Sequence, residues 1–349
     1  MQKKLIALAV AGMIAAPVAM AQSNVTIYGI VDAYVATGSQ GDEKLRSVDA
    51  GGLAGSRLGF RGTEDLGNGL KAYFVLEYGL GNDVNAGVGT ALARQQVVGL
   101  SGDFGSVGLG RQYAPGYFSL AYDAIASSGA LDPRPILAGN AGLTINPSSA
   151  ARWDNSVTYT GSFSGVTVRG IWSARGVELT RNAGLANEIK PGDDDAYGLS
   201  VGYANGPLSV GVFYHNISGN ALGATKNQTE WLLGGSYDFG VAKVVATYQA
   251  GKSVGHVSKN DVDVWSVGAI VPVSEAGNIH VSYGQSDFDA LSDGKAKSFG
   301  LAYTHKLSSR TTLYAGYNRV NNDKQTNAGF GSQVDENQNV LAVGVNHSF

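Results

Sequence analysis

The chain has 349 residues, 44% of them hydrophobic, a formal net charge of −3 and no cysteine. Because acidic residues slightly outnumber basic ones, the composition gives no electrostatic footprint for nucleic acid. Without cysteine the chain forms no disulfide bond, so its stability must come from packing and from backbone pairing.

The first 21 residues have the composition of a secretory signal peptide. Two lysines near the start precede an apolar run over residues 5–18, and small residues stand before Gln22. This order predicts export and cleavage before Gln22. We therefore expect residues 1–21 to be a signal peptide and residues 22–349 to form one domain. Beyond the signal peptide no apolar stretch approaches the roughly 20 residues that a membrane-spanning helix requires.

From residue 25 onward, apolar residues alternate with small and polar ones in short segments. Such a segment has one apolar and one polar face, which is typical of a strand that separates two environments. The apolar positions fall, in chain order, in residues 25–35, 58–60, 70–78, 98–100, 107–109, 157–159, 166–172, 197–203, 208–214, 231–239, 242–248, 265–271, 279–283, 299–303, 313–317 and 340–349.

The alternating segments predict a barrel that crosses a membrane. An exported chain with amphipathic strands and no spanning helix can satisfy its backbone in lipid only as a closed barrel. Connections alternate between short and long, as in barrels with short periplasmic turns and long external loops. The long ones are residues 38–51, 175–195, 218–228 and 318–339. The predicted fold class is all-β: a sixteen-stranded antiparallel transmembrane β-barrel around a water-filled lumen.

The connection over residues 113–151 differs from the other loops. It holds half of the chain's 8 prolines and many apolar residues. Folded outward it would form a flap, whereas folded inward it would narrow the lumen. A loop of this length usually has a function, and its apolar content favours packing against the inner wall. The fold prediction therefore includes an inward-folded third external loop.

Charged residues on the expected lumen side are the candidates for selectivity. By parity Arg57, Arg61, Arg152 and Arg169 face inward. A wet lumen tolerates a single charge, but several arginines that face one loop set a transverse field. Arg94 falls on the lipid face by the same count, where an arginine at mid-depth would cost about 2 to 4 kcal/mol. Either a bulge shifts the register or Arg94 lies at the membrane edge.

Four motifs stand out along the chain: residues 56–69 (SRLGFRGTEDLGNG), 94–102, 108–112 (GLGRQ) and 344–349 (GVNHSF). They resemble the general porins of Gram-negative bacteria, most closely the neisserial-type branch of β-proteobacteria, and the likeness covers the whole chain. The resemblance implies a homotrimer in the bacterial outer membrane, in contact with lipid and lipopolysaccharide. It also implies that the barrel-assembly machinery reads the terminal aromatic residue, Phe349.

The resemblance further assigns residues to a pore constriction. The family's wall arginines match Arg57, Arg94 and Arg152, which would place Arg94 inside the lumen. Acidic loop residues usually oppose these arginines, and Asp123 and Asp132 are the candidates, although neither stands in a clear acidic motif. The predicted constriction comprises Arg57, Arg61, Arg94, Arg152, Arg169, Asp123 and Asp132.

We predict a porin for passive diffusion of small hydrophilic solutes and ions. It should prefer anions, because positive charge outweighs negative charge at the predicted constriction. No catalytic residue, cofactor or metal is expected, since the 5 histidines occur singly and without metal-ligand spacing. Two alternatives come from other classes: a non-conducting barrel that acts as an adhesin or receptor through its external loops, and an outer-membrane hydrolase with a serine–histidine site.

Overall fold

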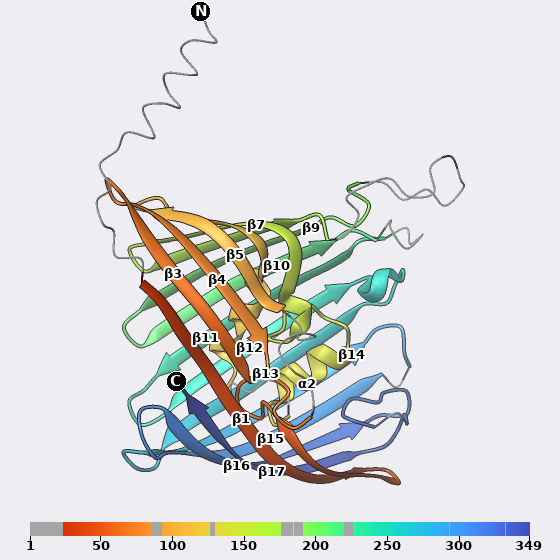
Figure 1. The fold of residues 1–349 in the computed structure, drawn as a ribbon. Coiled ribbons are helices and arrows are strands. Elements are labelled where there is room, and N and C mark those ends of the chain that lie inside the picture. Colours follow the sequence, from red (N-terminus) through yellow and green to blue (C-terminus); the bar gives the residue numbers. More distant parts are fainter. Residues whose placement is uncertain are drawn as a thin grey trace, which may run out of the picture.

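The computed structural model describes residues 24–84, 93–125, 130–175, 184, 191–219, 226–292, 294–331 and 333–349. The predicted signal peptide lies outside these residues. The described chain forms one antiparallel sheet, which closes into a barrel because its first and last strands pair with each other (Figure 1).

The sheet contains 17 strands, and four short helices are described beside them. The strands are β1 (Asn24–Gln40), β2 (Glu43–Ala50), β3 (Arg57–Gly67), β4 (Leu70–Gly79), β5 (Ala93–Gly102), β6 (Gly105–Tyr113), β7 (Arg152–Phe163), β8 (Val166–Ser173), β9 (Ala196–Asn205), β10 (Leu208–Ile217), β11 (Gln228–Asp238), β12 (Lys243–Lys252), β13 (Val262–Pro272), β14 (Gly277–Phe288), β15 (Lys295–Lys306), β16 (Thr311–Asn322) and β17 (Gln338–Ser348). The helices are η2 (Pro115–Tyr122), α2 (Pro133–Asn140), η3 (Ser149–Ala151) and η5 (Val254–His256).

The 17 strands occupy sixteen positions around the barrel, as predicted. β2 pairs with β1 over residues 33–40, and β3 pairs with β1 over residues 24–30. β2 and β3 therefore follow one another along the same edge of β1. The prediction of a loop over residues 38–51 is wrong, because the chain turns at Gly41, where φ is 56°, and returns as β2.

The last long connection is also shorter than predicted. β16 continues to Asn322 and β17 begins at Gln338, so the loop between them covers residues 323–337 instead of 318–339. Asn318 and Asn322 are buried within the barrel. Their amide side chains made this strand end resemble a loop, although the inner face of a barrel accepts polar side chains.

The two faces of the sheet differ in the way that the alternation predicts. On β10 and β11, Val212 and Leu233 are 50% and 51% exposed, whereas the adjacent Phe213 and Leu232 are 4% and 0% exposed. Apolar side chains that are exposed at every second position form a lipid-facing band. The inward residues pack against chain that fills part of the lumen.

Short turns and the ends of the described chain lie at one end of the barrel. Residues 68–69 and 206–207 link neighbouring strands there, and Asn68 and Gly69 both have positive φ, 52° and 79°. An Asn-Gly pair in this conformation matches the twist of a tight hairpin. Gly29 and Phe349 exchange backbone hydrogen bonds of 3.1 Å, which joins the last residue to the first strand.

The chain over residues 114–151, called here the inner segment, lies within the ring of strands (Figure 1). Its helix η2 packs against β8 to β12, and its helix α2 packs against β13 to β15. Leu131, Leu137 and Ile145 of this segment are fully buried. The hydrophobic core of the protein therefore lies between the inner segment and the inner wall. Among the described residues, no helix has the length and apolar composition to cross a membrane.

Candidate channel constriction

Inward-facing side chains of the wall hold the inner segment in place. His215 of β10 accepts a hydrogen bond through Nε2 from the backbone N–H of Gly116, at 3.0 Å. Glu230 of β11 accepts hydrogen bonds from the backbone N–H groups of Thr144 and Ile145, at 2.9 and 3.0 Å. Because these contacts lie near both ends of the inner segment, its position across the lumen is set by two neighbouring strands.

The inner segment contains a buried ion pair. Arg134 donates through Nε and Nη2 to the two carboxylate oxygens of Asp123, and both side chains are fully buried. Burial raises the pKa of Asp123, and the guanidinium of Arg134 opposes that shift. Asp132 is fully buried as well. The structure thus buries both carboxylates that the sequence placed at the constriction.

Three of the predicted arginines lie where strands begin, at the end of the barrel from which the long connections leave. Arg57 is the first residue of β3, Arg94 the second residue of β5 and Arg152 the first residue of β7. Alternate strands of an antiparallel barrel run in the same direction, so these strand starts share one end of the wall. Arg61 and Arg169 lie inside β3 and β8, nearer to the short turns.

A bulge turns Arg94 into the barrel. The pairing of β4 with β5 shifts its register next to Glu77, which leaves Arg94 as an extra residue on β5. The Arg94 Nε lies 2.7 Å from a Glu77 carboxylate oxygen, and its Nη2 donates to the hydroxyl of Tyr113 at 2.9 Å. Of the two alternatives for Arg94, the bulge is therefore confirmed. Bulges are frequent next to functional sites because they re-aim a side chain.

The carboxylate of Glu77 connects β4 to three other strands at this point. Besides Arg94, its carboxylate accepts hydrogen bonds from the hydroxyls of Tyr28 and Tyr113, at 3.0 and 2.7 Å. The sequence shows that Glu77 has inward parity on β4, but its partners come from β1, β5 and β6 and are not visible in it. The negative charge of Glu77 therefore offsets the positive charge of Arg94. The remaining positive charge of the predicted constriction belongs to the other arginines.

Four of the predicted arginines place their guanidinium groups over aromatic rings. The distances from guanidinium carbon to ring centroid are 5.1 Å for Arg61 over Tyr28, 5.9 Å for Arg94 over Tyr113, 5.6 Å for Arg152 over Tyr113 and 4.1 Å for Arg169 over Phe118. Stacking of this kind orients a guanidinium and leaves its edge free for other partners. Tyr113 in turn stacks on Tyr117 of the inner segment, with ring centroids 3.7 Å apart.

Asp32 of β1 is a positioning residue that the sequence analysis missed. Its carboxylate accepts hydrogen bonds from the backbone N–H groups of residues 52–54, at 2.9 to 3.1 Å, and from the hydroxyl of Tyr314 at 2.6 Å. The chain held in this way continues to Gly55, whose carbonyl accepts a hydrogen bond of 2.9 Å from Arg57 Nε. The one available signal was an acidic residue among the valines of the first strand.

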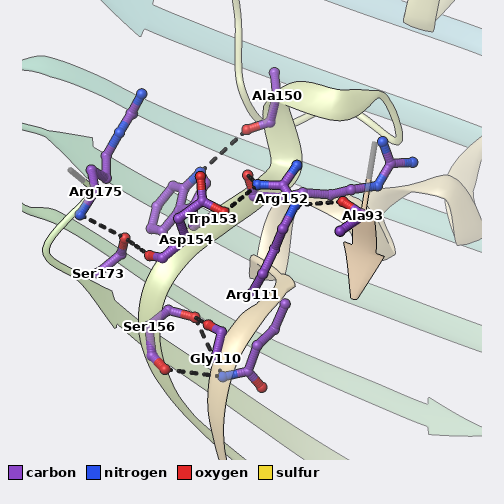
Figure 2. Close-up of polar contacts among 11 residues, drawn as sticks. Ala93, Gly110, Arg111, Ala150, Arg152, Trp153, Asp154, Ser156, Ser173 and Arg175 are labelled. Carbon is purple, nitrogen blue, oxygen red and sulfur yellow. Dashed lines mark hydrogen bonds and ion pairs between the residues drawn. The ribbon is translucent and has the colours of Figure 1, made fainter. Parts of the chain in front are cut away.

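A second polar network ties the end of β6 to the start of β7 at the same end of the barrel (Figure 2). Arg111 Nη1 lies 2.7 Å from a carboxylate oxygen of Asp154, and the same nitrogen lies 3.5 Å from the carbonyl oxygen of Arg152. The indole N–H of Trp153 donates to the Ala150 carbonyl at 3.2 Å. The network therefore fixes the backbone that carries Arg152 as the inner segment ends and β7 begins.

Comparison with known proteins identifies the family of this barrel. A family model described as Gram-negative porin matches residues 7–325. The chain belongs to the Gram-negative porin family. Outer membrane porin protein 32 of Delftia acidovorans is 35% identical over 370 aligned residues, which cover 100% of both chains. The prediction of a Gram-negative porin is therefore confirmed.

Solved porin structures share the fold. An anion-selective porin from Comamonas acidovorans superimposes with a TM-score of 0.78 and 30% identity, covering 94% of this chain and 100% of that one. The trimer form of OmpT from Vibrio cholerae superimposes with a TM-score of 0.66 and 18% identity, covering 94% and 99%. This porin is thus a sixteen-stranded channel protein of the bacterial outer membrane and not an enzyme.

Proposed function

We propose that this porin is an anion-preferring diffusion channel for small hydrophilic solutes. Its preference would be set by the wall arginines Arg57, Arg61, Arg94, Arg152 and Arg169. Arginine keeps its proton at physiological pH, so the preference should persist over the physiological range. A narrow aqueous passage lined by such charges attracts anions and repels cations.

One observation carries this proposal: the inner segment does not oppose the wall with its predicted carboxylates. Asp123 is engaged by Arg134, and the carboxyl group of Asp132 is buried. On the wall itself, Glu77 is the carboxylate that pairs with one of the five arginines, Arg94. Positive charge should therefore dominate the potential in the passage. The proposal leaves Asp123 and Asp132 out of the charge filter for the same reason.

The test is the zero-current potential of the reconstituted channel in a potassium chloride gradient. The wild type should show an anion-selective potential, and replacing Arg57, Arg94 and Arg152 together by serine should move it toward zero. The preference should weaken at roughly 1 M salt, where the screening length falls to about 3 Å. A cation-selective wild type, or a triple variant with an unchanged potential, would refute the proposal.

Arg310→Ser is the matched control for each of these three substitutions made singly. Arg310 is exposed in the connection between β15 and β16, at the short-turn end of the barrel. The substitution Arg310→Ser therefore removes one positive charge from the molecule and leaves the proposed filter unchanged. Its zero-current potential should equal that of the wild type, which separates a local effect of the wall arginines from an effect of total charge.

The assembly partners extend the same proposal. We expect a homotrimer, supported by the trimer form of a porin with the same fold. Its band of exposed apolar residues would contact outer-membrane lipid, and its loops would contact lipopolysaccharide. Residues 1–21 would be removed as a signal peptide, and N-terminal sequencing of the outer-membrane protein should then begin at Gln22. Sedimentation in detergent should give the mass of three mature chains.

A further inference from the structure

A small recess opens in the inner wall at Arg169, one of the proposed filter arginines. Its volume is about 140 Å³, and it lies between the inner faces of β4 to β8 and helix η2. Its apolar lining includes the rings of Tyr73, Tyr113 and Phe118, and its polar lining includes Ser106, Thr160 and Arg169. The recess therefore combines aromatic walls with one permanent positive charge.

Arg169 differs from the other buried or half-buried arginines in its partners. Arg94 and Arg134 each bond to a carboxylate, and Arg57 donates to a backbone carbonyl. Arg169 stacks on Phe118 at 4.1 Å, and within the described part of the chain no acceptor lies within hydrogen-bond or ion-pair distance of its guanidinium. Its N–H donors are therefore available to a ligand that enters from the lumen.

The size and lining of the recess indicate the shape of that ligand. An engineered apolar cavity of about 150 Å³ takes up benzene, so the recess of 140 Å³ has room for one aromatic ring. Tyrosine and phenylalanine rings pack on another ring edge-to-face or offset. A guanidinium edge matches a carboxylate, with two parallel hydrogen bonds. Chloride or phosphate would satisfy Arg169 but would leave the apolar walls in contact with water.

We propose that this recess is a binding subsite for small aromatic monocarboxylates of the benzoate class. The ring occupies the space beside Tyr73 and Phe118, and the carboxylate pairs with the guanidinium of Arg169. The subsite rests on the anion preference proposed above and adds a ligand class to it. By holding such a solute next to the filter, the recess raises its local concentration in the passage.

The experiment measures block of the chloride current by benzoate in planar bilayers that contain the full porin. At about 0.1 M salt, where the screening length is about 10 Å, benzoate and acetate are added separately and the half-blocking concentration of each is recorded. Burial of the ring should make the benzoate value lower than the acetate value by ~10-fold or more. Benzamide, which has the ring without the charge, should not block at these concentrations.

Two variants and one control assign the effect to the recess. Arg169→Gln should bring the ratio of the half-blocking concentrations of acetate and benzoate close to one. Phe118→Leu keeps the charge of Arg169 and should reduce the same ratio. Arg61→Gln also removes one lumen charge, but Arg61 does not line this recess, so the ratio should stay at the wild-type value. Phe118→Leu changes the inner segment and not a strand, so it tests the subsite even where Arg169→Gln fails to assemble.

The outcomes separate the subsite from the charge filter. Equal block by benzoate and acetate in the wild type would overturn the subsite, and so would a wild-type ratio in Arg169→Gln or in Phe118→Leu. The zero-current potential in potassium chloride reports on the filter alone. An anion-selective channel without benzoate preference would thus refute the subsite and leave the proposed function intact.

Discussion

At the scale of single residues, Glu77 and Asp123 show two uses of a carboxylate beside an arginine. Both are buried and both contact a guanidinium. Glu77 holds a wall arginine and two tyrosine hydroxyls at the edge of the passage, whereas Asp123 closes a contact within the inner segment. Under the proposed function, the first pair would set part of the charge of the passage, whereas the second pair holds two residues of the inner segment together.

We expect Glu77→Gln to increase anion preference and to reduce stability. Glutamine keeps an acceptor for Tyr28 and Tyr113 but removes the negative charge beside Arg94, so the potential in the passage becomes more positive. Removing one partner of a buried ion pair costs about 3 to 5 kcal/mol. The measurements are the zero-current potential and the temperature at which the folded protein unfolds in heat-modifiability gels.

The control for this substitution is Glu275→Gln. Glu275 is exposed in the connection between β13 and β14, so its replacement should change neither quantity. If Glu77→Gln left the zero-current potential at the wild-type value, the carboxylate of Glu77 would not contribute to the charge of the passage.

At the scale of elements, the strands could be predicted and their irregularities could not. Period-two alternation is a local pattern, so the segments around Val98 and Leu233 predict lipid-facing strands without knowledge of their partner strands. The sequence did not predict β2, because its apolar positions are few. It left the bulge at Arg94 as one of two alternatives, because a register shift is defined by the partner strand. The contacts that place the site join distant residues, as between Thr144 and Glu230.

The inner segment supports the second prediction at this scale. It is held across the lumen by Glu230 and His215, so removing its middle should widen the passage while the wall stays closed. We expect excision of residues 124–142 to raise single-channel conductance and to admit larger sugars in liposome swelling assays. The excision also removes Arg134 and leaves Asp123 without its partner, so Asp123→Asn should be combined with it.

A deletion in a different connection serves as the comparison. Shortening the connection over residues 289–294 removes chain between β14 and β15 and leaves the inner segment complete. Its conductance should remain near the wild-type value. Unchanged conductance after the excision of residues 124–142 would show that the inner segment does not limit flow.

At the scale of the whole molecule, closure of the ring satisfies the backbone of every strand. A barrel in lipid has no free edge, because each unpaired N–H or C=O group would be costly there. Here the closing pair is β1 with β17, from Ile30 opposite Ser348 to Gln40 opposite Gln338. The family and its channel function could be recognised from sequence motifs, but the charge balance of the passage depends on which carboxylates the fold buries.

Phe349 completes this closure and gives the last prediction. Its backbone exchanges hydrogen bonds of 3.1 Å with Gly29, and its ring lies where a side chain on Gly29 would stand. Deleting Phe349 removes both hydrogen bonds and the aromatic residue that the assembly machinery is expected to read. We therefore expect less folded porin in outer-membrane fractions, measured as heat-modifiable protein.

Phe349→Tyr keeps the backbone and the ring and should insert normally. Gly29→Val keeps the terminal aromatic residue but occupies the place of its ring, so it should fold poorly although the terminal residue can still be read. Normal insertion of the deletion variant would show that neither contact is needed for assembly.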